Sequence, residues 1–272
     1  MSRDTAMDSI MTIYRKSIWN SFTKGVREFD MIKPYDKIAV CISGGKDSMI
    51  LAKCMEKYSK ISGIPFSIIY LCMNPGYKPE NIQMILDNAN SLGLSLDVFD
   101  TKIFESIERE NNNPCFLCAR LRRGVLYRSA LERGCNKIAL GHHFDDVIET
   151  ILMGMLYGGQ IQTMMPKLHS DNYRGMQVIR PLYYVRESAI INWASSNNLE
   201  FLRCACSVTA NNDNRQNVSK RQEIKELIKT LKAQNPDIEN HIFRSVWNVD
   251  LKHLISYHLD DDCHHFLDRY DE

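Results

Sequence analysis

The fold is decided by one stretch of sequence, KIAVCISGGKDS at residues 37–48. Residues 37–42 form a short apolar run, which is typical of a strand buried on both faces of a sheet. A glycine pair at 44–45 follows this run directly, and the residues after it open a helix. Backbone N–H groups at such a turn approach an anion, and the start of a helix carries about half a positive charge. The stretch therefore predicts a phosphate-binding loop at the carboxyl end of a strand.

Two common nucleotide-binding patterns are excluded at this loop. A Walker loop needs glycine at position 40 and Ser or Thr after the lysine, whereas this chain has Val40 and Asp47. No G-x-G-x-x-G pattern is present either. The chain is therefore predicted to be neither an ordinary P-loop NTPase nor a dinucleotide-binding protein.

Apolar runs and helical patterns alternate on both sides of this loop. Further strands are predicted at 65–73, 95–99, 137–141 and 176–182, and helices at 46–60, 80–92, 116–132, 145–157 and 187–197. This alternation indicates βαβ units, and thus an α/β fold with a doubly wound parallel sheet.

The two ends of the chain are predicted to be helical. Apolar residues recur about every four positions over 10–29, which predicts an amphipathic helix there. The pattern over 213–258 also predicts helix throughout, with a break at Pro236. We expect an N-terminal helical segment (1–33), an α/β domain (34–210) and a C-terminal helical extension with an acidic tail (211–272).

Composition excludes several classes of protein. Hydrophobic residues make up 44 % and charged residues 25 % of the chain, and no run approaches the ~18 apolar residues of a membrane span. The first residues lack the apolar region and cleavage site of a signal peptide. We expect a soluble, cytoplasmic protein with no membrane partner.

The net charge of +1 conceals an uneven distribution. Residues 259–272 hold six acids and one base, which leaves +6 on residues 1–258, and 115–137 alone carry +5. Such a basic segment fits either a polyanion such as RNA or an ordinary solvated helix face, and charge alone does not choose between them.

Nine cysteines in a chain without an export signal favour metal or thiol chemistry over disulfides. Cys115 and Cys118 form a C-x-x-C motif, which serves zinc, redox and iron–sulfur sites equally well. Cys204 and Cys206 follow far downstream. Three thiolates could hold three irons of a 4Fe–4S cluster and leave the fourth iron open, whereas a fourth thiolate would complete a zinc site. Cys263-His264-His265 in the tail is interpreted as surface rather than as a metal site.

The stretch KIAVCISGGKDSM resembles the SGGxDS signature of the PP-loop ATP pyrophosphatase superfamily. These enzymes cleave ATP between the α- and β-phosphates, and their loop holds the pyrophosphate. The resemblance implies a set of ATP-binding residues: Ser43, Gly44, Gly45, Lys46, Asp47, Ser48 and Gly141. It also implies Mg²⁺ bound with the ATP, oriented by Asp47.

A second resemblance is narrower. PCFLCARLRRGVLY at 114–127 is similar to a motif of the tRNA 2-thiocytidine synthetases, the TtcA family. That family's later motifs follow in the same order, as GHHFDD (141–146), YGG (157–159), MPKL (165–168) and IRPL (179–182). The resemblance covers about residues 25–220 and implies an enzyme that thiolates tRNA, with ATP, a sulfur donor and a homodimeric state.

The TtcA resemblance also implies a 4Fe–4S cluster on Cys115, Cys118 and Cys204. This sequence departs from the family at the third ligand, because it has C-x-C where the family has C-x-x-C. Cys206 therefore stays an alternative ligand.

The reaction implied is adenylation of a pyrimidine carbonyl oxygen, followed by attack of sulfur and loss of AMP. Catalytic roles fall to Asp47, to Arg122 as a neutraliser of phosphate charge and to Asp146 near the α-phosphate. Helix capping is the competing interpretation of Asp146 and Asp145. The alternative function is another PP-loop sulfurtransferase or an amidating ligase with a structural zinc site.

Overall fold

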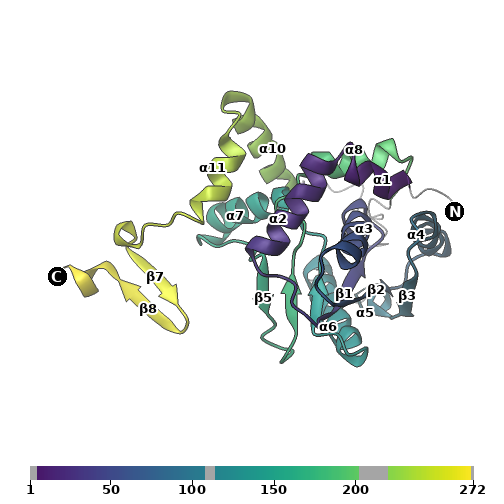
Figure 1. Cartoon of the computed structure of the whole chain (residues 1–272). Helices are drawn as coiled ribbons and strands as arrows, with labels where there is room; N and C mark the ends of the chain where they lie inside the picture. The colour runs from purple at the N-terminus through teal and green to yellow at the C-terminus, as the bar shows by residue number, and fades with distance from the viewer. Residues whose placement is uncertain (1–4, 108–113, 202–219, 271–272) are drawn as a thin grey trace. The chain divides into compact units, whose positions relative to one another are not determined.

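The computed structural model describes residues 5–107, 114–201 and 220–270 (Figure 1), and within helix α6 it describes side chains from Leu117 onward. The chain forms two compact units. The first comprises residues 1–147 and 165–217, and the second comprises 148–164 and 218–272.

A six-stranded sheet forms the centre of the first unit, in the order β3-β2-β1-β4-β6-β5. All neighbouring strands are parallel except β5, which runs antiparallel to β6 at the edge. The strands are β1 (Lys37–Ile42), β2 (Ser67–Asn74), β3 (Leu96–Asp100), β4 (Lys137–Ala139), β5 (Lys167–His169) and β6 (Gln177–Ile179). The prediction of a doubly wound α/β fold is confirmed, although β5 was not predicted.

Alternating side chains of the strands face two separate cores. Ile38, Val40 and Ile42 of β1 belong to a large cluster with the helices on one face of the sheet, while Ala39 and Cys41 pack with α6 on the other. Figure 1 shows α3 and α8 on one side of the sheet and α6 on the other. The helices are α1 (Thr5–Met11), α2 (Asn20–Glu28), α3 (Lys46–Ile61), α4 (Pro79–Ser91), α5 (Ile103–Ile107), α6 (Pro114–Glu132), α7 (Phe144–Gly158) and α8 (Glu187–Ser196).

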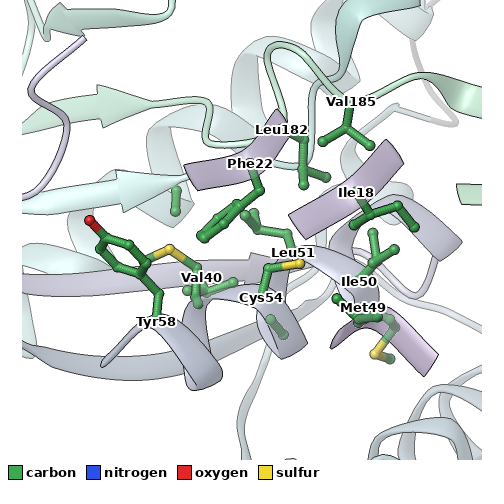
Figure 2. Close-up of a cluster of buried hydrophobic side chains, with 14 of the residues drawn as sticks. Ile18, Phe22, Val40, Met49, Ile50, Leu51, Cys54, Tyr58, Leu182 and Val185 are labelled. Atoms are coloured by element: carbon green, nitrogen blue, oxygen red, sulfur yellow. The ribbon is translucent and has the colours of Figure 1, made fainter. Parts of the chain in front are cut away.

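The larger core is built on α3. Figure 2 shows Met49, Ile50 and Leu51 of α3 lying among side chains from α2, β1 and the segment after β6. Phe22 meets the Tyr58 ring edge-on, with 5.7 Å between centroids. Burying α3 in this way fixes the position of its first turn, which follows the loop at 43–45.

The N-terminal helix is interrupted, contrary to the prediction of one helix over 10–29. A π-helical turn, η1 (Arg15–Trp19), separates α1 from α2, and Trp19 N–H bonds to Tyr14 O with the wider π spacing. Tyr14 Oη donates to Asn192 O of α8, and Trp193 Nε1 donates to Ala6 O. These contacts with α8 decide where the helix is broken, and such contacts are invisible to periodicity.

The second unit contains the end of α7, two helices and a hairpin. Glu149 of α7 is buried against Arg221 (2.7 Å) and Lys225 (3.6 Å) of α10. The elements are α10 (Lys220–Gln234), α11 (Ile238–Ser245), the 3₁₀ turn η2 (Leu251–His253), β7 (Ser256–Leu259), β8 (Asp262–His265) and the 3₁₀ turn η3 (Phe266–Arg269).

The prediction that 213–258 is helical throughout is wrong after Ser245, and residues 213–219 lie outside the described part. The acidic tail instead forms a β-hairpin, in which Asp260 takes the left-handed conformation (φ 54°) at a two-residue turn. Asp tolerates that conformation, so the acidic run supplies the turn that pairs β7 with β8. No helix in the described residues has the length and apolar character of a membrane span.

Candidate functional site

The site lies where the strand order reverses, at the carboxyl ends of β1 and β4. These two strands are neighbours, with Val40 opposite Ala139, and the helices after them begin at Lys46 and Phe144. An open α/β sheet forms its ligand crevice at such a point, because the connections leave in opposite directions. Loop 43–48 and loop 140–146 are thereby brought face to face.

The loop after β1 has a fixed backbone conformation. Gly44 has φ 84°, a value that favours glycine. The Ser48 hydroxyl donates to Gly45 O (2.9 Å) and accepts from Ser43 N–H (3.2 Å), which closes the loop onto the first turn of α3. The N-terminus of α3 therefore faces the crevice as a preformed anion-binding turn.

Gly141 allows the loop after β4 to approach. A Cβ at this position would lie 2.9 Å from the carbonyl carbon of Asp47 and 3.1 Å from Ser48 N. Both are backbone atoms that have no room to move aside. Only glycine lets the two loops meet at this distance, so Gly141 positions the loop that carries Asp47.

Three charged side chains converge on the start of α3. Lys46 Nζ lies 3.0 Å from Glu187 Oε1 and 3.3 Å from the carboxylate of Asp47. Burial lowers the pKa of Lys46, but the two carboxylates outweigh it and the net pKa is raised. Burial raises the pKa of Asp47, and Asp146 adds to the rise, whereas Lys46 and His143 oppose it. The pKa of Asp47 rises because burial outweighs the effects of Lys46 and His143, and the pKa of Lys46 rises because two carboxylates outweigh its burial.

One carboxylate oxygen of Asp47 is available to bind a cation. Oδ1 is buried and accepts no hydrogen bond from any described residue, although Lys46 Nζ lies near it. A buried carboxylate oxygen that accepts no hydrogen bond lowers the stability of the fold by about 1–3 kcal/mol or more, unless a ligand interacts with it. A hard cation such as Mg²⁺, which prefers oxygen ligands, fits this atom.

Asp146 and Asp145 both act as helix caps. His143 N–H donates to Asp146 Oδ2 (3.1 Å) while Asp146 N–H faces His143 Nδ1 (3.4 Å), a reciprocal arrangement at the start of α7. Asp145 Oδ2 accepts from Glu187 N–H (2.7 Å) at the start of α8, and Arg186 lies 3.1 Å from Oδ1. His143 Nε2 is 3.8 Å from Asp47 Oδ1 and 3.5 Å from Asp146 Oδ2, so Asp146 also belongs to the cluster around Asp47.

Arg122 and Cys118 lie one turn apart on α6. Arg122 Nη2 donates to Tyr77 Oη (3.3 Å), after the end of β2. Cys118 is a half-buried thiol that forms no disulfide and packs against an apolar cluster that includes Phe104. The side chain of Cys115 and all of Cys204 and Cys206 lie outside the described residues, and the described residues alone hold no group of three metal-ligating side chains.

Two members of the site were not predicted from the sequence. Arg180 Nε donates to His142 Nδ1 (3.3 Å), and Glu187 pairs with Lys46 across 141 positions of sequence. Arg180 lies within the IRPL motif at 179–182, which could have drawn attention to it. Glu187 has no local signal, because only the fold brings α8 to α3.

Comparison with known proteins agrees with this geometry. The model of the PP-loop domain matches residues 15–231. A tRNA-cytidine(32) 2-sulfurtransferase of Geobacter metallireducens is 36 % identical over 253 residues, covering 92 % of this chain and 96 % of that protein. This chain belongs to the PP-loop family of tRNA-cytidine(32) 2-sulfurtransferases.

This chain is also similar to a second curated relative and to a solved structure. A tRNA-cytidine(32) 2-sulfurtransferase of Neisseria meningitidis is 34 % identical over 267 residues, covering 96 % of this chain and 81 % of that protein. The U34-tRNA thiolase NcsA of Methanococcus maripaludis, solved with its [4Fe-4S] cluster, superposes with a TM-score of 0.65 at 23 % identity. That superposition covers 85 % of this chain and 79 % of NcsA, and it supports the PP-loop fold.

Proposed function

We propose that this protein is an ATP-dependent tRNA thiolase that forms 2-thiocytidine, at the position named for its relatives, cytidine 32. The observation that carries the proposal is the crevice between β1 and β4. There, a glycine-dependent anion-binding turn faces a buried carboxylate oxygen that lacks a donor. Such a pair suits a polyphosphate and its bound cation.

In this proposal the backbone of residues 43–48 binds the β- and γ-phosphates of ATP, and Asp47 holds Mg²⁺. Lys46 and Arg180 supply positive charge on opposite sides of the crevice, where charge develops as pyrophosphate leaves. Gly141 positions the two loops, and Asp146, held by His143, orients the cluster around Asp47. Attack of the cytosine O2 on the α-phosphorus releases pyrophosphate and leaves an adenylated base.

The residues available to hold a 4Fe–4S cluster are Cys115, Cys118 and Cys204, with Cys206 as the alternative third ligand. The described thiol is compatible with this use, because Cys118 is half-buried, forms no disulfide and lies one helical turn from Arg122. When bound through three thiolates, a cluster supplies an iron position open to a sulfur ligand. Arg122 then stands where it can neutralise phosphate charge beside that position.

The test is a single-turnover assay with anaerobically purified protein, a tRNA transcript, MgATP and sulfide as sulfur donor. We expect AMP, pyrophosphate and 2-thiocytidine in equal amounts, measured by nucleotide chromatography and nucleoside mass spectrometry. Cys118→Ala should lose both iron and thiolation, whereas Cys263→Ala, a matched change of an exposed cysteine, should keep both.

Two outcomes would contradict the proposal, and a third would change one cluster ligand. Release of ADP and phosphate would reject the pyrophosphatase chemistry. Stoichiometric zinc without iron would favour the amidating ligase with a structural zinc site. Iron retained by Cys204→Ala but lost by Cys206→Ala would move the third ligand. The homodimer and the cytoplasmic location stay predictions, and light scattering of the purified protein tests the first.

A further inference from the structure

A second cavity lies on α6, outside the crevice between β1 and β4. Its volume is about 520 Å³, within the ~300–1,000 Å³ range of small-molecule sites. It is lined by Ala119, Arg120, Arg123, Gly124 and Tyr127 of α6 and by Asn172 and Tyr173 of the turn before β6. The helical residues are spaced so that they share one face of α6, and this face differs from the one that carries Cys118 and Arg122.

The cavity contains two bases of the basic segment 115–137 that have no acidic partner among the described residues. Arg133 pairs with Asp97 (2.5 Å), and Lys137 is buried against Asp36 (2.7 Å), so two of the six bases are neutralised within the fold. By contrast, Arg120 and Arg123 are exposed and make no ion pair with any acid of the described residues. The lining holds two positive charges and no carboxylate, and Asp171, which lies outside the lining, interacts electrostatically with Tyr127.

The walls of the cavity are aromatic and rigid. Tyr127 and Tyr173 meet edge-to-face with 5.3 Å between centroids, and Tyr173 Oη donates to Gly124 O (2.9 Å). A Cβ at Gly124 would lie 3.4 Å from that hydroxyl, so the absent side chain lets the ring seat closely. Burial raises the pKa of Tyr127, which keeps its hydroxyl protonated as a donor. Together with the Asn172 amide, these groups suit a nucleobase and its phosphate.

Arg180 connects the cavity to the crevice. Burial lowers its pKa from the ordinary value, and its guanidinium interacts electrostatically with Tyr127 and Arg123 on one side and with Asp146 on the other. The same guanidinium donates to His142 Nδ1 in the loop after β4. Arg180 thus links the residues of the cavity with the loop after β4 through one hydrogen bond and its electrostatic interactions.

We propose that this cavity binds one nucleotide of the tRNA next to the reacting one. Its phosphodiester lies on Arg120 and Arg123, and its base lies against Tyr173 and Asn172. This inference rests on the proposed function and names the contact that seats its substrate. An RNA phosphodiester is favoured over a second ATP, because its two non-bridging oxygens can each accept a hydrogen bond from one guanidinium group. A triphosphate also brings a cation, for which the lining offers no carboxylate.

The test compares Arg120→Gln, Arg123→Gln and their double variant with Arg128→Gln. Arg128 is an exposed arginine of the same helix that does not line the cavity, so this control removes an equal charge. Filter binding of a tRNA transcript to the full chain is measured between 50 and 200 mM salt. The double variant should lower the slope of log affinity against log salt by about 0.7–0.9, as expected for one lost phosphate contact, and each single variant should lower it by less.

The double variant should bind tRNA about tenfold more weakly at 150 mM salt, with unchanged affinity for MgATP. If Arg128→Gln weakens tRNA binding as much as the cavity variants do, tRNA responds only to the overall positive charge of the helix, and the proposed role of the cavity is wrong. If the double variant loses affinity for MgATP and keeps its affinity for tRNA, the cavity binds a free nucleotide and the inference is wrong. The inference is also wrong if the wild-type chain does not bind tRNA. Cavity-dependent binding without thiolation would instead reject the proposed function and leave the cavity standing.

Discussion

Helices α3 and α6 both carry motifs of the site, but they depend on different interactions. Most of α3 is buried, and its functional first turn is held by backbone contacts: the Ser48 hydroxyl, the Gly44 conformation and the approach of Gly141. On α6 the functional groups are side chains, and two of its arginines are exposed and line a cavity. The backbone of the loop at α3 is held within the fold, whereas the proposed roles of α6 depend on side chains that would contact ligands.

This contrast predicts where substitutions act. Changes at the loop of α3 should alter ATP chemistry strongly, because backbone geometry and one buried carboxylate are shared by every step. Changes on α6 should each remove one side-chain contact. Their effects on activity should therefore be smaller, and they should leave ATP chemistry unchanged. The four predictions below run from the largest expected effect to the smallest.

Asp47→Ala should reduce pyrophosphate release by about 10²–10³-fold or more, because it removes the buried oxygen proposed to hold Mg²⁺. Its melting temperature should stay near that of the wild type, since the side chain lines a crevice rather than the core. Asp87→Ala on the surface of α4 is the matched control and should keep full activity. Turnover within tenfold of the wild type would remove Asp47 from the catalytic set.

Gly141→Val should weaken MgATP binding by about 10²-fold, since its Cβ meets the backbone of Asp47 and displaces the loop. The crowding should also lower the free energy of unfolding by about 1–3 kcal/mol. Urea titration and isothermal titration calorimetry measure the two effects. Gly158→Ala, where the added carbon meets nothing within 4 Å, should change neither. Unchanged ATP affinity in Gly141→Val would show that the two loops are not coupled.

MgATP affinity should fall about tenfold per pH unit on the acid side of the Asp47 titration, because the cation needs the ionised carboxylate. Since burial raises the pKa of Asp47, this decline should begin above the ordinary range of an aspartate. The raised pKa means that the folded chain holds this proton more tightly than the unfolded chain does. The ligand-free protein should therefore lose stability as pH rises through that window.

Asp47→Asn provides the check on that titration. It should bind MgATP weakly at every pH between 5 and 8, with no acid decline, and its ligand-free form should melt at a slightly higher temperature than the wild type at pH 7. Fluorescence titration and calorimetry measure the two. An acid decline that persists in Asp47→Asn would assign the titration to another group.

Tyr77→Phe should have the smallest effect. It removes one hydrogen bond from Arg122, worth about 0.5–1.5 kcal/mol, and leaves the ring packed on Phe104. ATP pyrophosphate release should be unchanged, while thiolation slows by less than tenfold. A thermal melt and the single-turnover assay measure these effects. A large loss of pyrophosphate release would show that α6 and the loop of α3 are not separable.

The predictable part of this molecule was local. The strand at 37–42, the loop at 43–45 and the start of α3 follow from a continuous pattern, and each observed strand of the parallel sheet lies within two residues of a predicted one at its start. The π-helical turn at Arg15–Trp19 and the edge strand β5 were not predicted, because both depend on contacts with residues far away in the sequence. The hairpin at 256–265 was not predicted, because its strands are short and its turn is made of aspartates; only its first three residues lie in the range predicted as helix.

The sequence by itself determined the parallel sheet, the anion-binding loop and the membership of the family, because these rest on backbone conformation and on residues adjacent in the chain. Only the tertiary structure decided which charges of segment 115–137 are neutralised. It also decided that Glu187 shares Lys46 with Asp47, and that Tyr173 walls a cavity on α6. Such contacts join residues 36 to 141 positions apart. Their energies depend on burial and distance, which exist only once the chain has folded.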